Sequence, residues 1–181
     1  MKTEIFKSIR KIALASVVIL FISCETDIPE TDTTIPSFSF NISGDGFNRT
    51  FTQDDDFTSL QLNLRTDTTY DFIFSGADSG GEERTPRLYP HDYIEFSTEI
   101  LAPWETTSVT FLSSLVYWDG NEANPTTGNI LAGKLVTNGD SVSISFTFLV
   151  RDFGGLDGTS NTITKSMNIY IDDQNTEVIL L

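Results

Sequence analysis

Residues 142–150 read Val-Ser-Ile-Ser-Phe-Thr-Phe-Leu-Val, and this stretch decides the fold class. Large apolar side chains recur at every second position, and serine or threonine fills most of the positions between them. Successive side chains of an extended strand point to opposite faces, so a period of two predicts a strand with one buried and one exposed face. The apolar face consists of Val142, Ile144, Phe146, Phe148 and Val150. A matching face returns at 163–171 with Ile163, Met167, Ile169 and Ile171.

Further strands are predicted on the N-terminal side of this pair. Alternating or aromatic-rich runs indicate them at 38–42, 60–64, 69–74, 93–97, 108–112 and 129–137. Asn138 and Gly139 both tolerate the positive φ of a tight antiparallel turn, so they predict a β-hairpin between 129–137 and 142–150. No window after residue 24 shows an apolar stripe at helical spacing. Eight or nine short strands therefore predict an all-β fold, a single antiparallel β-sandwich over residues 36–181.

The segment 146–172, FTFLVRDFGGLDGTSNTITKSMNIYID, places an aspartate and a glycine-rich turn between two alternating strands. It resembles the last strand pair of bacterial immunoglobulin-like domains. The resemblance implies that the sandwich is immunoglobulin-like.

The first 23 residues form a segment of a different kind. A basic start with Lys2, Lys7, Arg10 and Lys11 precedes an uncharged apolar run over 12–22, which is shorter than the roughly 20 residues of a membrane-spanning helix. Ser23 and Cys24 end that run, and this pattern resembles the lipobox of bacterial lipoproteins, in particular of the Bacteroidota type. The resemblance implies cleavage between Ser23 and Cys24, with lipid, including palmitate, on Cys24. The alternative is an ordinary secretory signal or a short membrane anchor with a buried cysteine.

Residues 24–35 are acidic and threonine-rich, and they predict a flexible tether between the lipid and the 36–181 domain. The acids Glu25, Asp27 and Glu30 resemble the signal that exports such lipoproteins to the outer face of the outer membrane. A position on its periplasmic face, or a merely solvated linker, is the alternative. Thr33, within Asp32-Thr33-Thr34, resembles an O-glycosylation site of Bacteroidota.

The composition limits the classes of function. The 181-residue chain has 11 Lys and Arg against 26 Asp and Glu, a formal charge of −15, which argues against nucleic acid as a partner. One cysteine excludes an intramolecular disulfide. One histidine leaves little scope for histidine-based catalysis or metal binding. We expect a monomeric domain that needs no cofactor.

Two short strings imitate hydrolase signatures. Residues 77–81 resemble the nucleophile loop of trypsin-like proteases, and residues 139–142 resemble the start of a GDSL esterase block. Both families need a histidine base, and His91 lies on the wrong side of Ser79 and of Ser141. We therefore interpret both strings as turns and expect that the chain is not an enzyme.

Two regions are candidate ligand-binding sites. Residues 75–92 are long for a connection in a compact domain, and such loops often bind something. The segment near residue 118 adds aromatic side chains that would suit a sugar, or alternatively fill the core. The candidate residues are Arg84, Arg87, Tyr89, His91, Tyr117 and Trp118.

The loop 152–161 is a candidate calcium site. Asp152, Asp157 and Asn161 offer oxygen ligands, and its glycines allow the backbone to bend around an ion. The alternative is a plain connection between two strands. Calcium is the one cofactor that the sequence suggests.

These observations predict a lipid-anchored outer-membrane or cell-surface lipoprotein. We expect a non-catalytic binding or structural module with a glycan or protein ligand. The alternative is a small surface glycan hydrolase that uses paired carboxylates.

Overall fold

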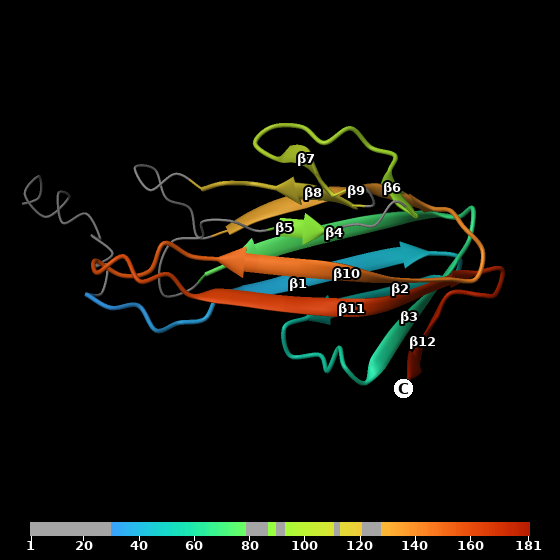
Figure 1. Ribbon diagram of the computed structural model, residues 1–181, viewed down its shortest axis with the longest axis horizontal. Coiled ribbons are helices and arrows are strands. Elements are labelled where there is room, and N and C mark those ends of the chain that lie inside the picture. Colours follow the sequence, from blue (N-terminus) through green and yellow to red (C-terminus); the bar gives the residue numbers. More distant parts are fainter. Residues whose placement is uncertain (1–29, 79–86, 90–92, 111–112, 121–127) are drawn as a thin grey trace, which may run out of the picture.

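A computed structural model describes residues 30–78, 87–89, 93–110, 113–120 and 128–181 (Figure 1). Within these ranges the chain forms strands and no helix. The strands are β1 (Ser37–Gly44), β2 (Phe47–Thr52), β3 (Leu60–Arg65), β4 (Thr69–Ala77), β5 (Arg87–Tyr89), β6 (Ile94–Phe96), β7 (Glu105–Thr110), β8 (Ser113–Tyr117), β9 (Gly128–Thr137), β10 (Val142–Arg151), β11 (Thr162–Asp172) and β12 (Glu177–Leu180).

The strands form two sheets that pack as a β-sandwich, which confirms the predicted all-β fold class. One sheet has the order β2-β1-β4-β9-β6, and the other has the order β12-β3-β11-β10-β5-β8-β7. The strand pairs are antiparallel, as predicted, except that β11 runs parallel to β3. A parallel pair needs a long crossover connection, and the chain from β4 to β10 supplies one.

The β10–β11 pair is the hairpin predicted from residues 146–172. Its antiparallel ladder runs from Val142 opposite Ile171 to Arg151 opposite Thr162. The apolar face of both strands is buried, as their period of two predicts.

The core between the sheets is built largely from phenylalanine rings. Phe148 on β10 is completely buried, and its ring centroid lies 5.0 Å from that of Phe38 and 5.1 Å from that of Phe40, both on β1. Phe74 on β4 lies 5.9 Å from the same ring. Phe148 therefore joins the two sheets at the centre of the sandwich.

The predicted hairpin at Asn138 and Gly139 is wrong. β9 pairs with β4 and β6 in one sheet, whereas β10 belongs to the other sheet, so the turn carries the chain between the sheets. Gly139 has the expected positive φ of 96°. However, the Asn138 amide donates to Tyr93 O at 3.0 Å, beside β6, and a Cβ at residue 139 would lie 2.8 Å from the Tyr93 ring. The pairing of β9 with β6 therefore determines where the chain goes after β9, and the turn preference of Asn138 and Gly139 does not.

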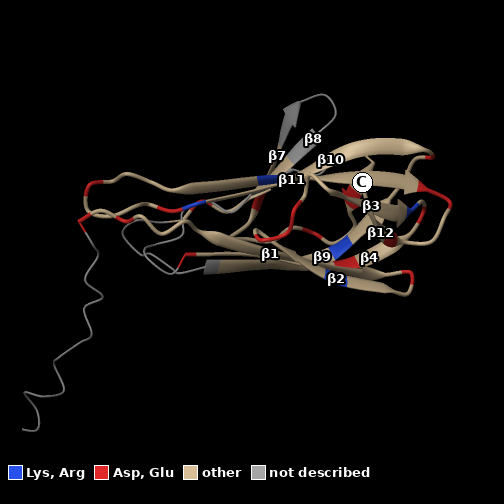
Figure 2. Cartoon of the chain, turned by 90° about the horizontal axis from the view of Figure 1, so that it is seen from below, with Lys and Arg blue, Asp and Glu red and all other residues tan. Residues whose placement is uncertain are grey.

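Acidic residues are frequent in the loops of the sandwich, and some charged residues also lie within strands, such as Asp71 on β4 and Lys134 on β9. Figure 2 shows acidic residues gathered in the loops at both ends of the sandwich, with long uncharged stretches of strand between them. In the ranges that the structure describes, no helix has the length and apolar character to span a membrane.

Candidate functional site

Uncharged polar side chains occupy the middle of the outer side of β3, β11 and β10, and the charged residues Arg65 and Asp172 follow in a neighbouring row. The strand registers place Ser145 opposite Asn168, and Asn168 opposite Gln61. A second row places Ser143 opposite Tyr170, and Tyr170 opposite Asn63. We call these six residues the polar face: Gln61, Asn63, Ser143, Ser145, Asn168 and Tyr170. Their side chains point outward because the alternate positions of the same strands fill the core.

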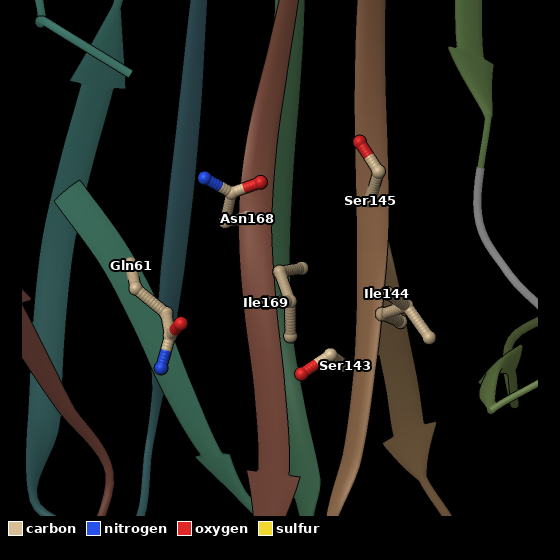
Figure 3. Close-up of a pocket in the computed structure, with 6 residues that line it drawn as sticks. All are labelled: Gln61, Ser143, Ile144, Ser145, Asn168 and Ile169. Atoms are coloured by element: carbon tan, nitrogen blue, oxygen red, sulfur yellow. The ribbon is translucent and has the colours of Figure 1, made fainter. Parts of the chain in front are cut away.

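Part of the polar face is hollowed into an open depression of about 500 Å³. It is lined by Gln61, Ser143, Ser145 and Asn168, drawn in Figure 3 on three neighbouring strands, together with Ile144 and Ile169. The Gln61 amide donates to Asn63 Oδ1 at 2.8 Å, which orders that edge of the face. Hydroxyls both donate and accept hydrogen bonds, and side-chain amides do so through separate atoms, so the surface suits a neutral ligand rich in such groups.

Of the six ligand-binding candidates of the sequence analysis, Tyr117 and Trp118 have described side chains, and both lie outside the polar face. Arg84 and His91 fall outside the described residues. Arg87 and Tyr89 are the first and last residues of β5, and the backbone of this strand pairs with β10 and β8. Tyr117 is half-buried at the end of β8, and its hydroxyl donates to Glu105 Oε2 at 2.8 Å.

Trp118 packs in the core and is not placed to contact a ligand. Its side chain is 9% exposed and belongs to the same buried cluster as the phenylalanine rings. Large aromatic side chains gain most by leaving water, so burial favours the packing alternative for this residue.

The turn interpretation of the esterase-like string agrees with the structure. Ser141 lies in the connection between β9 and β10 with a φ of 56°, and its hydroxyl donates to Asp140 at 3.2 Å. Ser79 of the protease-like string lies outside the described residues, as do Ser23 and Cys24.

A second site is buried at one end of the sandwich. Asp32 precedes β1, Asp78 directly follows β4, and Asp152 directly follows β10. They are 4%, 2% and 0% exposed, and each offers a carboxylate oxygen within 4.8 Å of those of the other two. Sheet pairing brings them together, because the start of β1 lies opposite the end of β4, with Ser37 paired to Ala77. We call this group the aspartate cluster.

Asn161 holds two members of the aspartate cluster in place. Its backbone amide donates to Asp152 Oδ1 at 2.6 Å, and its side-chain amide donates to Asp152 Oδ2 at 2.9 Å and to the Asp32 carbonyl at 3.0 Å. The Thr34 amide donates to Asp32 Oδ1 at 2.8 Å. Asp32 Oδ2 is buried and has no hydrogen-bond partner among the described residues.

The three ligands expected in the candidate calcium loop do not lie together in the structure. Asp152 belongs to the aspartate cluster, and Asn161 binds to it. Asp157 is exposed and lies outside the cluster, where hydrogen bonds from the Thr159 amide and the Thr31 hydroxyl lower the pKa of its carboxyl group. The sequence analysis did not find Asp32 and Asp78, which are far from this loop along the chain.

The end of the predicted tether is docked on the same loop. The Asp157 amide donates to the Glu30 carbonyl at 2.9 Å, and the Thr31 hydroxyl donates to Asp157 Oδ2 at 3.1 Å. Asp32 is buried, and Glu30, Thr31 and Asp32 contact the 152–161 loop, whereas the boundary of the tether at residue 35 stays a prediction. Thr33 is exposed within this docked segment.

Comparisons with known proteins found similar solved structures. No protein-family model and no curated protein matches the chain. Among solved structures, the chain is similar to a cohesin module from a family 33 glycoside hydrolase of Clostridium perfringens ATCC13124. The TM-score is 0.42 and the identity 11%, over 77% of this chain and 100% of that one.

Proposed function

We propose that this chain is a lipid-anchored surface lipoprotein whose β-sandwich is a non-catalytic module that binds a neutral glycan. The observation that carries the proposal is the polar face, an uncharged surface of hydroxyl and amide groups on a chain of formal charge −15. The anchor is the lipid expected on Cys24, and the expected location is the outer face of the outer membrane.

The chemistry of the polar face favours a sugar ligand. Sugar hydroxyls donate and accept hydrogen bonds, and Asn168, Gln61 and the two serines offer both functions across three adjacent strands. Tyr170 adds a half-buried ring beside them, which supplies apolar contact together with a polar hydroxyl. The six residues of the polar face are uncharged, so a neutral ligand that contacts them alone binds without the cost of desolvating an ion such as the neighbouring Glu177 or Arg65.

A protein ligand is the competing candidate, and the binding experiment below separates it from a glycan. The glycan hydrolase alternative would need accessible paired carboxylates. Among the described residues, the three carboxylates that gather most closely are those of the aspartate cluster, and they are buried from any substrate.

We expect Asn168→Ala to weaken glycan binding roughly tenfold or more, because it removes a side chain that hydrogen-bonds at the centre of the polar face. The full chain is run in affinity gels that contain a panel of neutral polysaccharides. Asn48→Ala is the matched control, since Asn48 is an exposed strand asparagine on the other sheet. Retention of the full chain by no neutral glycan, or equal retention of both variants, contradicts the proposal. Protein partners recovered without glycan binding would favour the competing candidate.

We expect Cys24→Ser to abolish membrane association. A single acyl chain anchors a protein only marginally, and the cysteine of a lipoprotein carries more than one. The measurement is membrane fractionation with labelled palmitate. Ser23→Ala keeps a small residue before the cysteine and should keep the label. Unchanged label and membrane recovery in Cys24→Ser would refute lipidation, and protease treatment of whole cells distinguishes the outer from the periplasmic face.

A further inference from the structure

The aspartate cluster is costly to bury without a counter-charge. An isolated carboxylate removed from water loses far more solvation energy than neutral hydrogen bonds return, and three close together also repel one another. Among the side chains that the structure describes, the ion pairs are Arg49–Asp55, Arg65–Asp45 and Lys134–Asp71. None of these cations reaches Asp32 or Asp152. A cation from solution would supply a positive charge next to Asp32 and Asp152.

One oxygen of the cluster is left available for such a cation. Asp32 Oδ1 accepts the Thr34 amide, whereas Oδ2 is buried and has no hydrogen-bond partner among the described residues. A buried oxygen without a partner costs free energy, and coordination to a metal ion would satisfy it. This unpartnered oxygen belongs to a residue that already lies within reach of the other two carboxylates.

We propose that Asp32, Asp78 and Asp152 bind one calcium ion. Calcium takes oxygen ligands at about 2.3–2.6 Å, so two of its ligands are separated by at most about 4.6–5.2 Å. The carboxylate oxygens of the cluster lie within 4.8 Å of one another, which fits that coordination sphere. Magnesium needs shorter bonds and near-ideal octahedral geometry, and zinc favours nitrogen and sulfur ligands. The calcium site is independent of the proposed glycan face.

The proposed ion has a structural consequence for the anchor. It would join the end of the tether to the ends of β4 and β10, one strand from each sheet. Residues 30–34 already contact the 152–161 loop through Glu30, Thr31 and Asp32. Calcium would therefore clamp the tether to the domain and fix how the sandwich projects from its lipid anchor.

The test measures the melting temperature of the full chain in detergent micelles, first with a chelator and then with about 5 mM CaCl₂. This concentration lies above the roughly 10⁻⁴–10⁻³ M dissociation constants of extracellular calcium modules. Binding to the folded state alone should raise the melting temperature by about 2–9 °C. The same concentration of MgCl₂ should raise it less. Titration calorimetry with CaCl₂ should give one ion per chain.

The melting temperatures of Asp32→Asn distinguish a calcium ligand from an aspartate with a purely structural role. It removes one of three mutually repelling charges, so the variant should melt in chelator at or above the wild-type temperature and lose most of the calcium response. Asp140→Asn makes the same charge change in an exposed turn at the other end of β10 and should keep the full response. A full response in Asp32→Asn overturns the proposal. If that variant does not fold, the wild-type titration decides alone, and zero stoichiometry overturns the proposal.

Discussion

Phe148→Ala is expected to destabilise the domain by about 3–5 kcal/mol, the usual cost of truncating a fully buried phenylalanine. The ring lies between the two sheets, within 5.0–6.1 Å of the rings of Phe38, Phe40, Phe57, Phe74 and Phe146. Its removal would leave a cavity whose walls come from both sheets, which limits how far they collapse. Guanidinium unfolding followed by tryptophan fluorescence measures the loss.

Leu149→Ala is the matched control for this prediction. Leu149 is the next residue of the same strand, points to the opposite face and is only half-buried, so we expect a loss of about 1 kcal/mol. Equal losses for the two variants would contradict the assignment of the core face of β10. That assignment is the one from which the fold class was predicted.

The alternating strands could be predicted from sequence because their signal is local. On β10, serine and threonine stand between buried apolar residues, and the structure places them as the period of two requires. The partners of each strand are not local. The Asn138-Gly139 turn has the residues of a hairpin, but β9 is already paired with β4 on one edge and with β6 on the other, so it cannot pair with β10. The sequences of β3 and β11 contain no pattern that indicates their parallel pairing.

The candidate sites show the same division between local and distant signals. Asp152 and Asn161 were found because they share one loop, and they interact. Asp32 and Asp78 join them only because β1 pairs with β4 and both sheets end at the same place. Likewise, the serines of the polar face follow from the alternation in β10, whereas Gln61 and Asn63 reach it through the parallel pair.

Trp118 shows why an aromatic residue cannot be assigned to a site or to the core from its neighbours in sequence. Tyr117 and Trp118 are adjacent at the end of β8 and lie beside acidic and amide residues, a composition that suits a sugar site. Adjacent residues in an extended chain point to opposite sides. Tyr117 remains half-buried with its hydroxyl on Glu105, and Trp118 is in the core.

We therefore expect Trp118→Ala to lower the free energy of unfolding by about 3–5 kcal/mol, as for other large buried aromatics. Tyr117→Phe is its control, because it keeps the ring and removes the hydroxyl whose hydrogen bond to Glu105 is exposed, and it should cost less than about 1 kcal/mol. Chemical unfolding of both variants, followed by far-ultraviolet circular dichroism so that the lost tryptophan does not alter the signal, measures the difference. A Trp118→Ala variant as stable as the wild type would contradict its place in the core and return this residue to the list of ligand contacts.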